Sequence, residues 1–165
     1  MSQRTPLTDE FWQEFRTRHP EIEDRYEAYS FGNTPPMADE LVELVLAGPK
    51  RATAGLARWH IGEAADEELP RVGDHNVLLD GSGRPRCIVR TTDVEVKPLD
   101  QVDARFAWDE GEGDRSLGYW VAAHHRFFRG EADQHGFEFR EDMDTVFERF
   151  TIVWPLDVAD KESNA

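Results

Sequence analysis

The sequence predicts an α+β protein built on a mostly antiparallel β-sheet with flanking helices. Helical patterns come first in the chain, and strand patterns dominate its middle, where β-branched residues are frequent from Arg86 to Val96. One later helix, from Ser116 to about Arg129, precedes a closing strand at Phe147 to Trp154. This order is typical of an antiparallel sheet that can close into a barrel, and not of alternating β-α-β units.

The N-terminal elements are predicted from apolar spacing and from helix-ending residues. Residues 8–29 have a helical pattern, which Pro20 divides into two pieces. Residues 37–47 form an amphipathic helix that Gly48 can end.

The other elements are predicted from strand composition and turn residues. Strands are expected at 52–59 and 76–80, and Gly81-Ser82-Gly83 forms a hairpin turn before the long strand. Residues 99–102 form a short turn or helix, and residues 107–114 form an acidic, glycine-containing loop. The end of the chain, from Val158, is expected to fray.

Length and composition predict one domain. The chain has 165 residues, so we expect a helical N-terminal extension over 1–30 that packs on the main domain over 31–156, and a flexible tail over 157–165. The single cysteine, Cys87, excludes an internal disulfide and is interpreted as a small core residue. No apolar run is long enough to span a membrane, and the N-terminus lacks the apolar run of a secretory signal, so a cytoplasmic protein without membrane contact is expected.

The charge distribution is uneven. The net charge of −15 disfavours a protein that grips long nucleic acid. Two intervals nevertheless lack acidic residues: one holds Lys50, Arg51 and Arg58, and the other holds Arg84, Arg86 and Arg90. If these residues converge on one concave surface, the site would suit a nucleotide or a short single strand. The alternative is that the basic residues lie on solvated strands.

The sharpest local motif is Gly48-Pro49-Lys50-Arg51-Ala52-Thr53. It is not a phosphate-binding P-loop, because the glycine-rich run and the Gly-Lys-Ser/Thr ending are missing. The motif resembles the Gly-x-Lys-x-x-Thr signature of the ASCH domain family, of the longer bacterial type. The similarity continues through residues 72–74, 89–96 and 111–117 and through Tyr119-Trp120, and it covers roughly residues 31–156.

The resemblance implies a PUA-like β-barrel with flanking helices and a cleft that handles RNA or a nucleotide. Ribonuclease activity assisted by a divalent metal, Mg²⁺ or Mn²⁺, is associated with longer members, and it would point to Lys50 and Ser116 as catalytic residues. A shorter branch removes acetyl from N4-acetylcytidine with a lysine, a threonine and a glutamate. Lys50, Thr53 and Glu110 match these residues, with Asp109 or Glu112 as alternatives to Glu110. A non-catalytic module that binds RNA or a nucleotide is the third alternative.

The residue chemistry leaves two arrangements of Lys50 open. A neutral Lys50 could activate the Thr53 hydroxyl, which favours deacylation. A charged Lys50, paired with a carboxylate such as Glu110, could instead hold a phosphate or an oxyanion, which favours phosphodiester cleavage. In either case we expect Lys50 to meet Thr53 or a carboxylate from residues 109–114.

Several further residues are candidates for binding. Asp109, Glu110, Glu112 and Asp114 could hold Mg²⁺ or Mn²⁺, or could form a mobile acidic loop. His124 falls on the apolar stripe of its helix, where a hydrogen-bonded core histidine is expected. Trp59 could stack on a base or pack against a helix. The set that we expect to contact RNA or a nucleotide comprises Arg51, Arg58, Trp59 and Arg86.

Overall fold

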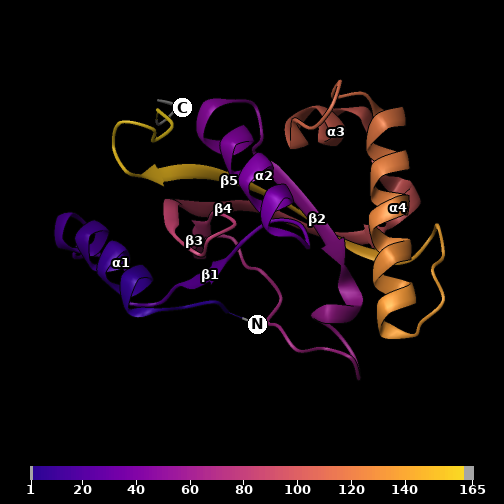
Figure 1. Ribbon diagram of the computed structural model, residues 1–165, viewed down its shortest axis with the longest axis horizontal. Helices are drawn as coiled ribbons and strands as arrows, with labels where there is room; N and C mark the ends of the chain where they lie inside the picture. Colours follow the sequence, from indigo (N-terminus) through magenta and orange to yellow (C-terminus); the bar gives the residue numbers. More distant parts are fainter. Residues whose placement is uncertain (1, 162–165) are drawn as a thin grey trace. The chain divides into compact units, whose positions relative to one another are not determined.

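The computed structural model describes residues 2–161, and it has an α+β fold (Figure 1). Its five-stranded sheet has the order β1-β3-β4-β5-β2. The pairs β3–β4 and β2–β5 are antiparallel, and β1–β3 is parallel. The prediction of a mostly antiparallel sheet in an α+β fold is therefore confirmed.

The chain divides into two compact units. Unit 1 comprises the residues up to Gly48, residues 71–92 and the residues from Phe150 onward, and unit 2 comprises residues 49–70 and 93–149. The long strands β4 (Pro85–Pro98) and β5 (Asp144–Trp154) each begin in one unit and end in the other. The expected division into an N-terminal extension, a main domain and a tail remains a prediction.

The N-terminal helix of unit 1 is shorter than its sequence pattern suggested. Helix α1 (Pro6–Arg18) is capped by Thr5, and its Trp12 and Phe15 are buried in a core cluster with Tyr26. The second predicted helical piece is wrong, because β1 (Glu27–Tyr29) follows instead and pairs with β3 (His75–Leu79). In this short strand the side chain of Ala28 is buried and its two neighbours are more exposed, which is the two-residue alternation of a strand. Three residues are too few for this alternation to be recognised in a sequence.

The remaining core of unit 1 lies against the buried face of helix α2 (Pro35–Ala47). Thr34 caps this helix, and prolines occupy its first positions. The first N–H groups of a helix have no partner within it, so proline, which lacks an N–H, is tolerated there. The helix therefore begins two residues before the predicted start. Its Val42 and Val45 are buried in a cluster with Leu78 and Cys87, as expected for a core cysteine.

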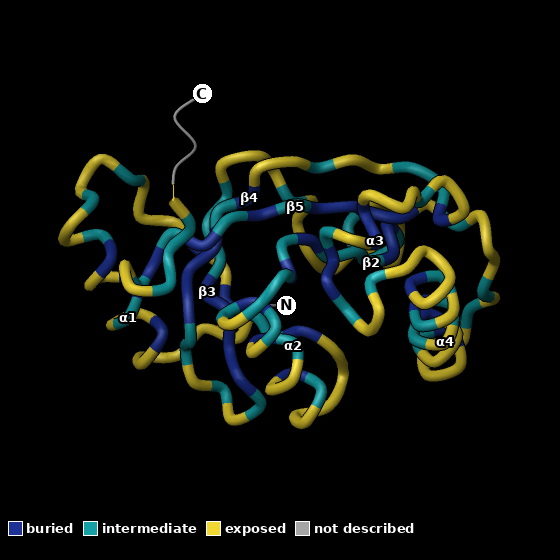
Figure 2. Tube along the Cα trace, turned by 90° about the horizontal axis from the view of Figure 1, so that it is seen from above, coloured by how far each residue is buried: buried dark blue, intermediate teal, exposed yellow. Residues whose placement is uncertain are grey.

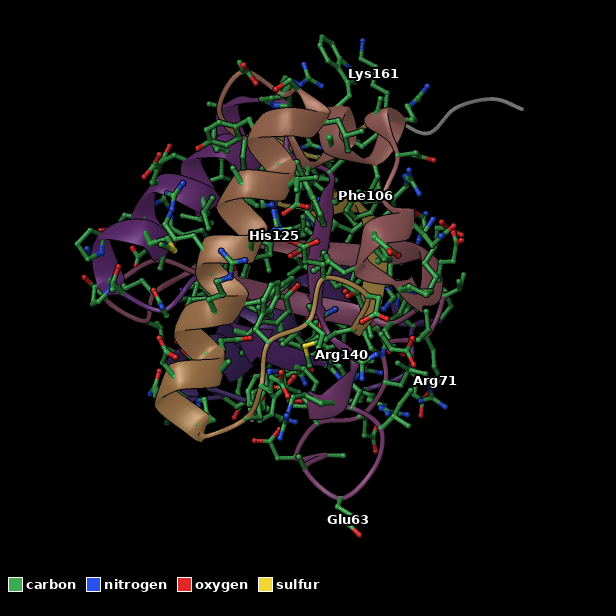
Figure 3. All side chains as sticks on the ribbon, turned by 90° about the vertical axis from the view of Figure 1, so that its right-hand side faces the viewer. Glu63, Arg71, Phe106, His125, Arg140 and Lys161 are labelled. Carbon is green, nitrogen blue, oxygen red and sulfur yellow. The ribbon has the colours of Figure 1, made fainter. Side chains whose placement is uncertain are left out.

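Unit 2 combines strand β2 and parts of β4 and β5 with two helices. Strand β2 (Ala52–Leu56) pairs with β5, and the 3₁₀ turn η1 (Ala57–Trp59) replaces the end of the predicted strand. A second turn, η2 (Leu99–Gln101), follows β4 as predicted. Helices α3 (Ala104–Glu110) and α4 (Leu117–His135) lie side by side. Figure 2 shows the buried segments of β4 and β5, and Figure 3 shows unit 2 from the side of α4, with Phe106 on α3.

The start of the predicted acidic loop is wrong. Residues 107–110 belong to α3, because Asp103 caps a helical turn that ends only at Gly111, in the left-handed conformation. Only residues 111–116, between α3 and α4, are a loop. Glu110 therefore has a fixed helical position.

The described part of the expected C-terminal tail is held in place. The Asp160 carboxylate accepts hydrogen bonds from Thr151 Oγ1 and from the backbone N–H of Ile152, each at 2.9 Å. Residues 162–165 lie outside the described residues. Over residues 2–161, no helix has both the length and the apolar character needed to cross a membrane.

Candidate active site

Lys50 is buried immediately before β2. Its side chain is 1% exposed, and Nζ lies 2.9 Å from the carbonyl oxygen of Ala52, 3.2 Å from Glu112 Oε2 and 3.5 Å from Glu110 Oε1. The predicted contact between Lys50 and a carboxylate from residues 109–114 is therefore present. Burying an ammonium group is costly unless anions and hydrogen-bond acceptors surround it, and this site supplies both.

The backbone around Gly111 makes this contact possible. A Cβ added to Gly111 would lie 2.8 Å from the backbone nitrogen of Lys50, so a larger residue would push the two segments apart. Beside it, the backbone N–H of Arg51 donates to the carbonyl of Asp109 at 2.8 Å. The end of α3 is thus fastened to the chain at the start of β2.

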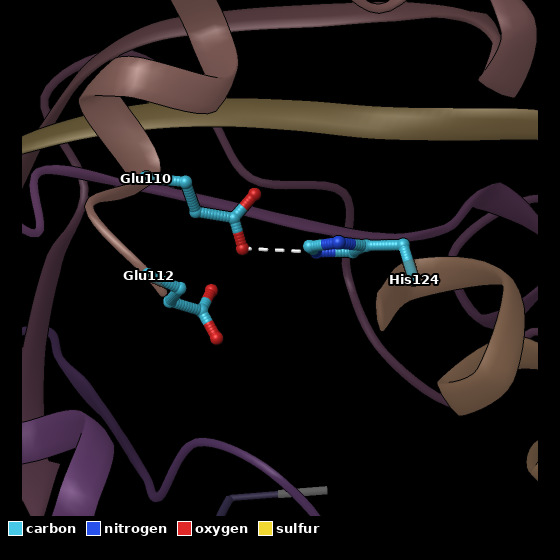
Figure 4. A group of neighbouring side chains, drawn as sticks. All are labelled: Glu110, Glu112 and His124. Atoms are coloured by element: carbon cyan, nitrogen blue, oxygen red, sulfur yellow. Dashed lines mark hydrogen bonds and ion pairs between the residues drawn. The ribbon is translucent and has the colours of Figure 1, made fainter. Parts of the chain in front are cut away.

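Glu110 connects Lys50 to helix α4, and Figure 4 shows its contact with His124 on that helix. Its Oε2 accepts a hydrogen bond from Trp120 Nε1, and its Oε1 lies 3.0 Å from His124 Nε2. The other ring nitrogen of His124, Nδ1, lies 2.8 Å from the Trp120 carbonyl, and the two rings stack with centroids 3.8 Å apart. His124 is thus a hydrogen-bonded buried histidine, as expected, and it also belongs to the site.

The charges of this cluster follow from its contacts. Burial alone would raise the pKa of Glu110, but the charges of Lys50 and then His124 hold it well below its usual range. Burial would lower the pKa of His124, but the Glu110 carboxylate raises it overall. Since both nitrogens of His124 face acceptors, both carry hydrogen, and the ring is an imidazolium cation.

Glu112 differs from Glu110 in exposure and in acidity. Burial raises its pKa, and the neighbouring Glu110 carboxylate adds to the rise against the opposing charge of Lys50. Its side chain is partly exposed, whereas those of Glu110 and Lys50 are not. Glu112 is therefore the member of the cluster that solvent or a substrate can reach, and it is the more basic of the two carboxylates.

The cluster contains possible metal ligands, but a cation already lies between them. One ligand atom from each of Glu110, Glu112 and His124 falls within 4.8 Å of the others. A divalent ion there would meet the Lys50 ammonium, which contacts both carboxylates, and an imidazolium that has no free lone pair. The arrangement as it stands does not fit a resident metal.

The four carboxylates predicted to act together separate into three groups. Glu110 and Glu112 meet at Lys50. Asp109 forms ion pairs with Arg105 and Arg149, each at 3.1 Å. Asp114 accepts a hydrogen bond from the backbone N–H of Ser116 at 2.9 Å. Only two of the four side chains thus enter the cluster.

The other predicted catalytic residues have visible structural roles. Ser116 caps α4, where its Oγ accepts from Tyr119 N at 3.1 Å. Thr53 lies in β2 opposite Glu148, next to the buried Ala52. Their catalytic roles remain predictions.

The predicted RNA-binding residues also have partners within their own units. The Arg58 guanidinium carbon lies 3.7 Å from the centroid of the Phe137 ring, and Trp59 Nε1 donates to Glu131 at 3.4 Å. Arg51 donates to the Lys50 carbonyl at 2.7 Å, and Arg86 forms an ion pair with Glu43 at 2.7 Å. Convergence of the two basic intervals on one surface stays a prediction.

The sequence pattern did not indicate Trp120 or His124 as site residues. Both lie on the buried stripe of α4, where aromatic residues are normally core residues. The signal that could have found the site was a histidine on a buried helix face, because a buried histidine needs a hydrogen-bond partner. Glu110 is that partner.

The fold is that of an ASCH domain. The family model for the ASCH domain matches residues 27–154, and the chain belongs to this family. ASCH domains are PUA-like and generally bind RNA. The match begins at β1, so the strand that the sequence pattern missed is part of the domain.

Two solved structures are similar over most of the chain. One is an ASCH domain from Lactobacillus crispatus, with 34% identity, a TM-score of 0.78, and coverage of 88% of this chain and 91% of that one. The other is protein EF3133 from Enterococcus faecalis, with 33% identity, a TM-score of 0.77, and coverage of 89% and 92%. No curated protein matches the chain.

Proposed function

We propose that this ASCH domain is a ribonuclease that cleaves single-stranded RNA at the Lys50 cluster. The observation that carries the proposal is the burial of Lys50 between two carboxylates, one of which is held by an imidazolium. Such a cluster of charges is expensive to bury and weakly justified by stability alone. Perturbed ionisable groups gathered at one point are the usual sign of catalysis.

Glu112 and Lys50 have complementary roles in the proposed reaction. The 2′-hydroxyl attacks the adjacent phosphorus, and Glu112, the more basic carboxylate, accepts its proton. The bond from phosphorus to the 5′-oxygen breaks on the opposite side, where water protonates the leaving oxygen and Glu112 releases its proton to solvent, which leaves a 2′,3′-cyclic phosphate and a 5′-hydroxyl. Lys50 stabilises the negative charge on the phosphoryl oxygens, and Glu110 keeps Lys50 charged and in place.

This chemistry requires Glu112 to swing away from Lys50 when a phosphate arrives, since Lys50 is otherwise covered. Gly111 and Gly113 flank Glu112, and both have positive φ angles, 72° and 58°. Glycine adopts such angles without the steric cost that other residues incur, so this backbone conformation of the loop that carries Glu112 is unstrained at both glycines.

A second candidate function is deacetylation of N4-acetylcytidine. The contact between Lys50 and Glu110 brings together two of the three residues that the resemblance assigns to that reaction, and Thr53 lies three positions further on. The net charge of −15 also suits a neutral nucleoside better than a polyanion.

Two assays on purified protein separate these functions. Cleavage of a fluorescent single-stranded RNA should proceed in EDTA, because Lys50 supplies the positive charge. Restoration of activity only by Mg²⁺ or Mn²⁺ would support the metal-assisted alternative instead. Release of acetate from N4-acetylcytidine, lost in Thr53→Val, would support the deacetylase. Inactivity in both assays together with RNA binding would leave a binding module.

A further inference from the structure

Two exposed aromatic side chains flank the loop that carries Glu112. Trp108, on α3, is 53% exposed and lies two residues before Glu110. Tyr119, on α4, is 45% exposed and directly precedes Trp120. The two helices that hold the buried cluster therefore each present a ring to solvent. Single exposed apolar residues need no explanation, but two rings beside one active-site loop do.

Residues 111–116 contact both rings. The Arg115 guanidinium carbon lies 3.6 Å from the centroid of the Trp108 ring, and its Nε donates to the Trp108 carbonyl at 2.9 Å. At the other ring, a Cβ added to Gly113 would come within 2.3 Å of the Tyr119 side chain, so the ring lies directly against the loop. Trp108, Arg115 and Tyr119, which we call the aromatic platform, are thus connected through the loop that carries Glu112.

Arg115 combines this contact with an unusual backbone conformation. Its φ angle is 65°, in the left-handed region, and it is the only non-glycine residue with a positive φ among residues 2–161. This conformation costs a non-glycine residue about 1 kcal/mol or more. The contact with Trp108 offsets that cost, and it keeps a cation stacked on a ring that remains half exposed.

We propose that the aromatic platform stacks on unpaired bases of single-stranded RNA next to the scissile phosphate. This inference rests on the proposed function and specifies its substrate. Indole, phenol and guanidinium planes are the groups that bind single strands without reading sequence. Glu112 and Asp114 in the same loop, and the net charge of −15, disfavour tracking of the phosphate backbone, so the bases must supply the contact.

A binding experiment with a non-cleavable strand tests the platform independently of catalysis. The probe is a fluorescent 2′-O-methyl oligonucleotide, and its dissociation constant is measured by anisotropy. Trp108→Leu and Tyr119→Leu should each raise this constant about tenfold, the scale of losing one base–aromatic stack. Tyr119→Phe keeps the ring and should bind like the wild type. Ile61→Ala, at a residue that is 52% exposed, is the control for loss of exposed apolar area.

Abasic substitution gives the reciprocal test. Removing the bases from the same strand should weaken binding by the wild type and leave binding by the Trp108→Leu, Tyr119→Leu double variant unchanged. The inference is overturned if the two leucine variants bind as well as the wild type, or if the wild type binds no single strand. Ring-dependent binding without any RNA cleavage would support the platform and refute the proposed catalysis, so the two failures are distinguishable.

Discussion

Each unit contains a tryptophan that donates its indole N–H to a carboxylate, but the surroundings of the two pairs differ. In unit 1, Trp12 donates to Asp24 at 2.8 Å, and the Asp24 side chain is 56% exposed. In unit 2, Trp120 donates to Glu110, whose side chain is 3% exposed. The hydrogen bond from Trp12 lowers the pKa of Asp24, whereas burial opposes ionisation of Glu110 and two buried cations are needed to overcome it.

The comparison shows that the contact alone does not mark a site. Asp24 joins helix α1 to the loop that follows it, and its own carboxylate remains largely in water, so its charge needs no buried partner. Glu110 organises Lys50 and His124 in the interior, where nothing else could compensate their charges. Burial of the whole group separates a candidate active site from an ordinary surface contact.

The largest expected effect comes from Glu110→Gln. Two buried cations would lose their shared anion, so the free energy of unfolding should fall by about 3 kcal/mol, as when a buried ion pair loses one partner. Chemical denaturation measures this change. A variant as stable as the wild type would show that Glu110 is not the anion on which the cluster depends.

A pH dependence follows from His124, whose pKa is raised in the folded protein above its ordinary value of 6.5. A raised pKa in a base means that the folded state holds the proton more tightly than the unfolded state. The contribution of His124 to the free energy of unfolding is therefore complete below pH 6.5, and it is lost as the pH rises through the pKa that His124 has in the folded protein. His124→Gln should therefore flatten the decline of unfolding free energy above pH 6.5. An unchanged slope would contradict the imidazolium assignment.

A smaller effect is expected for Ser116→Ala. Loss of this cap should reduce the free energy of unfolding by about 1 kcal/mol. RNA cleavage at a temperature where the variant is folded should continue at the wild-type rate, because Ser116 Oγ is engaged at the start of α4. A fall of a hundredfold in rate without loss of stability would instead support the catalytic role that the family resemblance implies.

The smallest effect is expected for Asp24→Asn, which is the counterpart of Glu110→Gln in unit 1. An exposed carboxylate gains little from its pairing, so the denaturation midpoint should remain close to that of the wild type. If both variants lost the same stability, the distinction between the two tryptophan–carboxylate pairs would fail.

Local signals predicted much of the fold. The apolar stripe of α2, Ser116 before α4 and the β-branched run of β4 are all recognisable without a structure, whereas the sequence pattern assigns Thr34 and the two prolines that begin α2 to a loop. The prediction failed at β1 and at α3, where only three and seven residues carry the pattern. Periodicity cannot be recognised over such short segments.

The site was only partly predictable because its contacts join distant parts of the chain. Lys50 and Glu110 are 60 positions apart in the sequence. Their contact was predicted only because the Gly-x-Lys-x-x-Thr motif resembles the ASCH signature. Nothing local shows that His124 faces Glu110, that Lys50 is buried, or that Asp109 and Asp114 bind elsewhere. Those facts depend on how α3 and α4 pack.

The central claim is that Lys50 is needed for RNA cleavage. Its most direct test compares the rate at which the Lys50→Met and Lys97→Met variants cleave single-stranded RNA. Lys97 is the matched control, since its Nζ pairs with Glu95 at 3.1 Å and lies over the Phe147 ring. Lys50→Met, assayed where circular dichroism shows it folded, should lose at least about a hundredfold in rate, and Lys97→Met should retain the wild-type rate. A folded Lys50→Met variant that cleaves RNA at the wild-type rate would contradict the account.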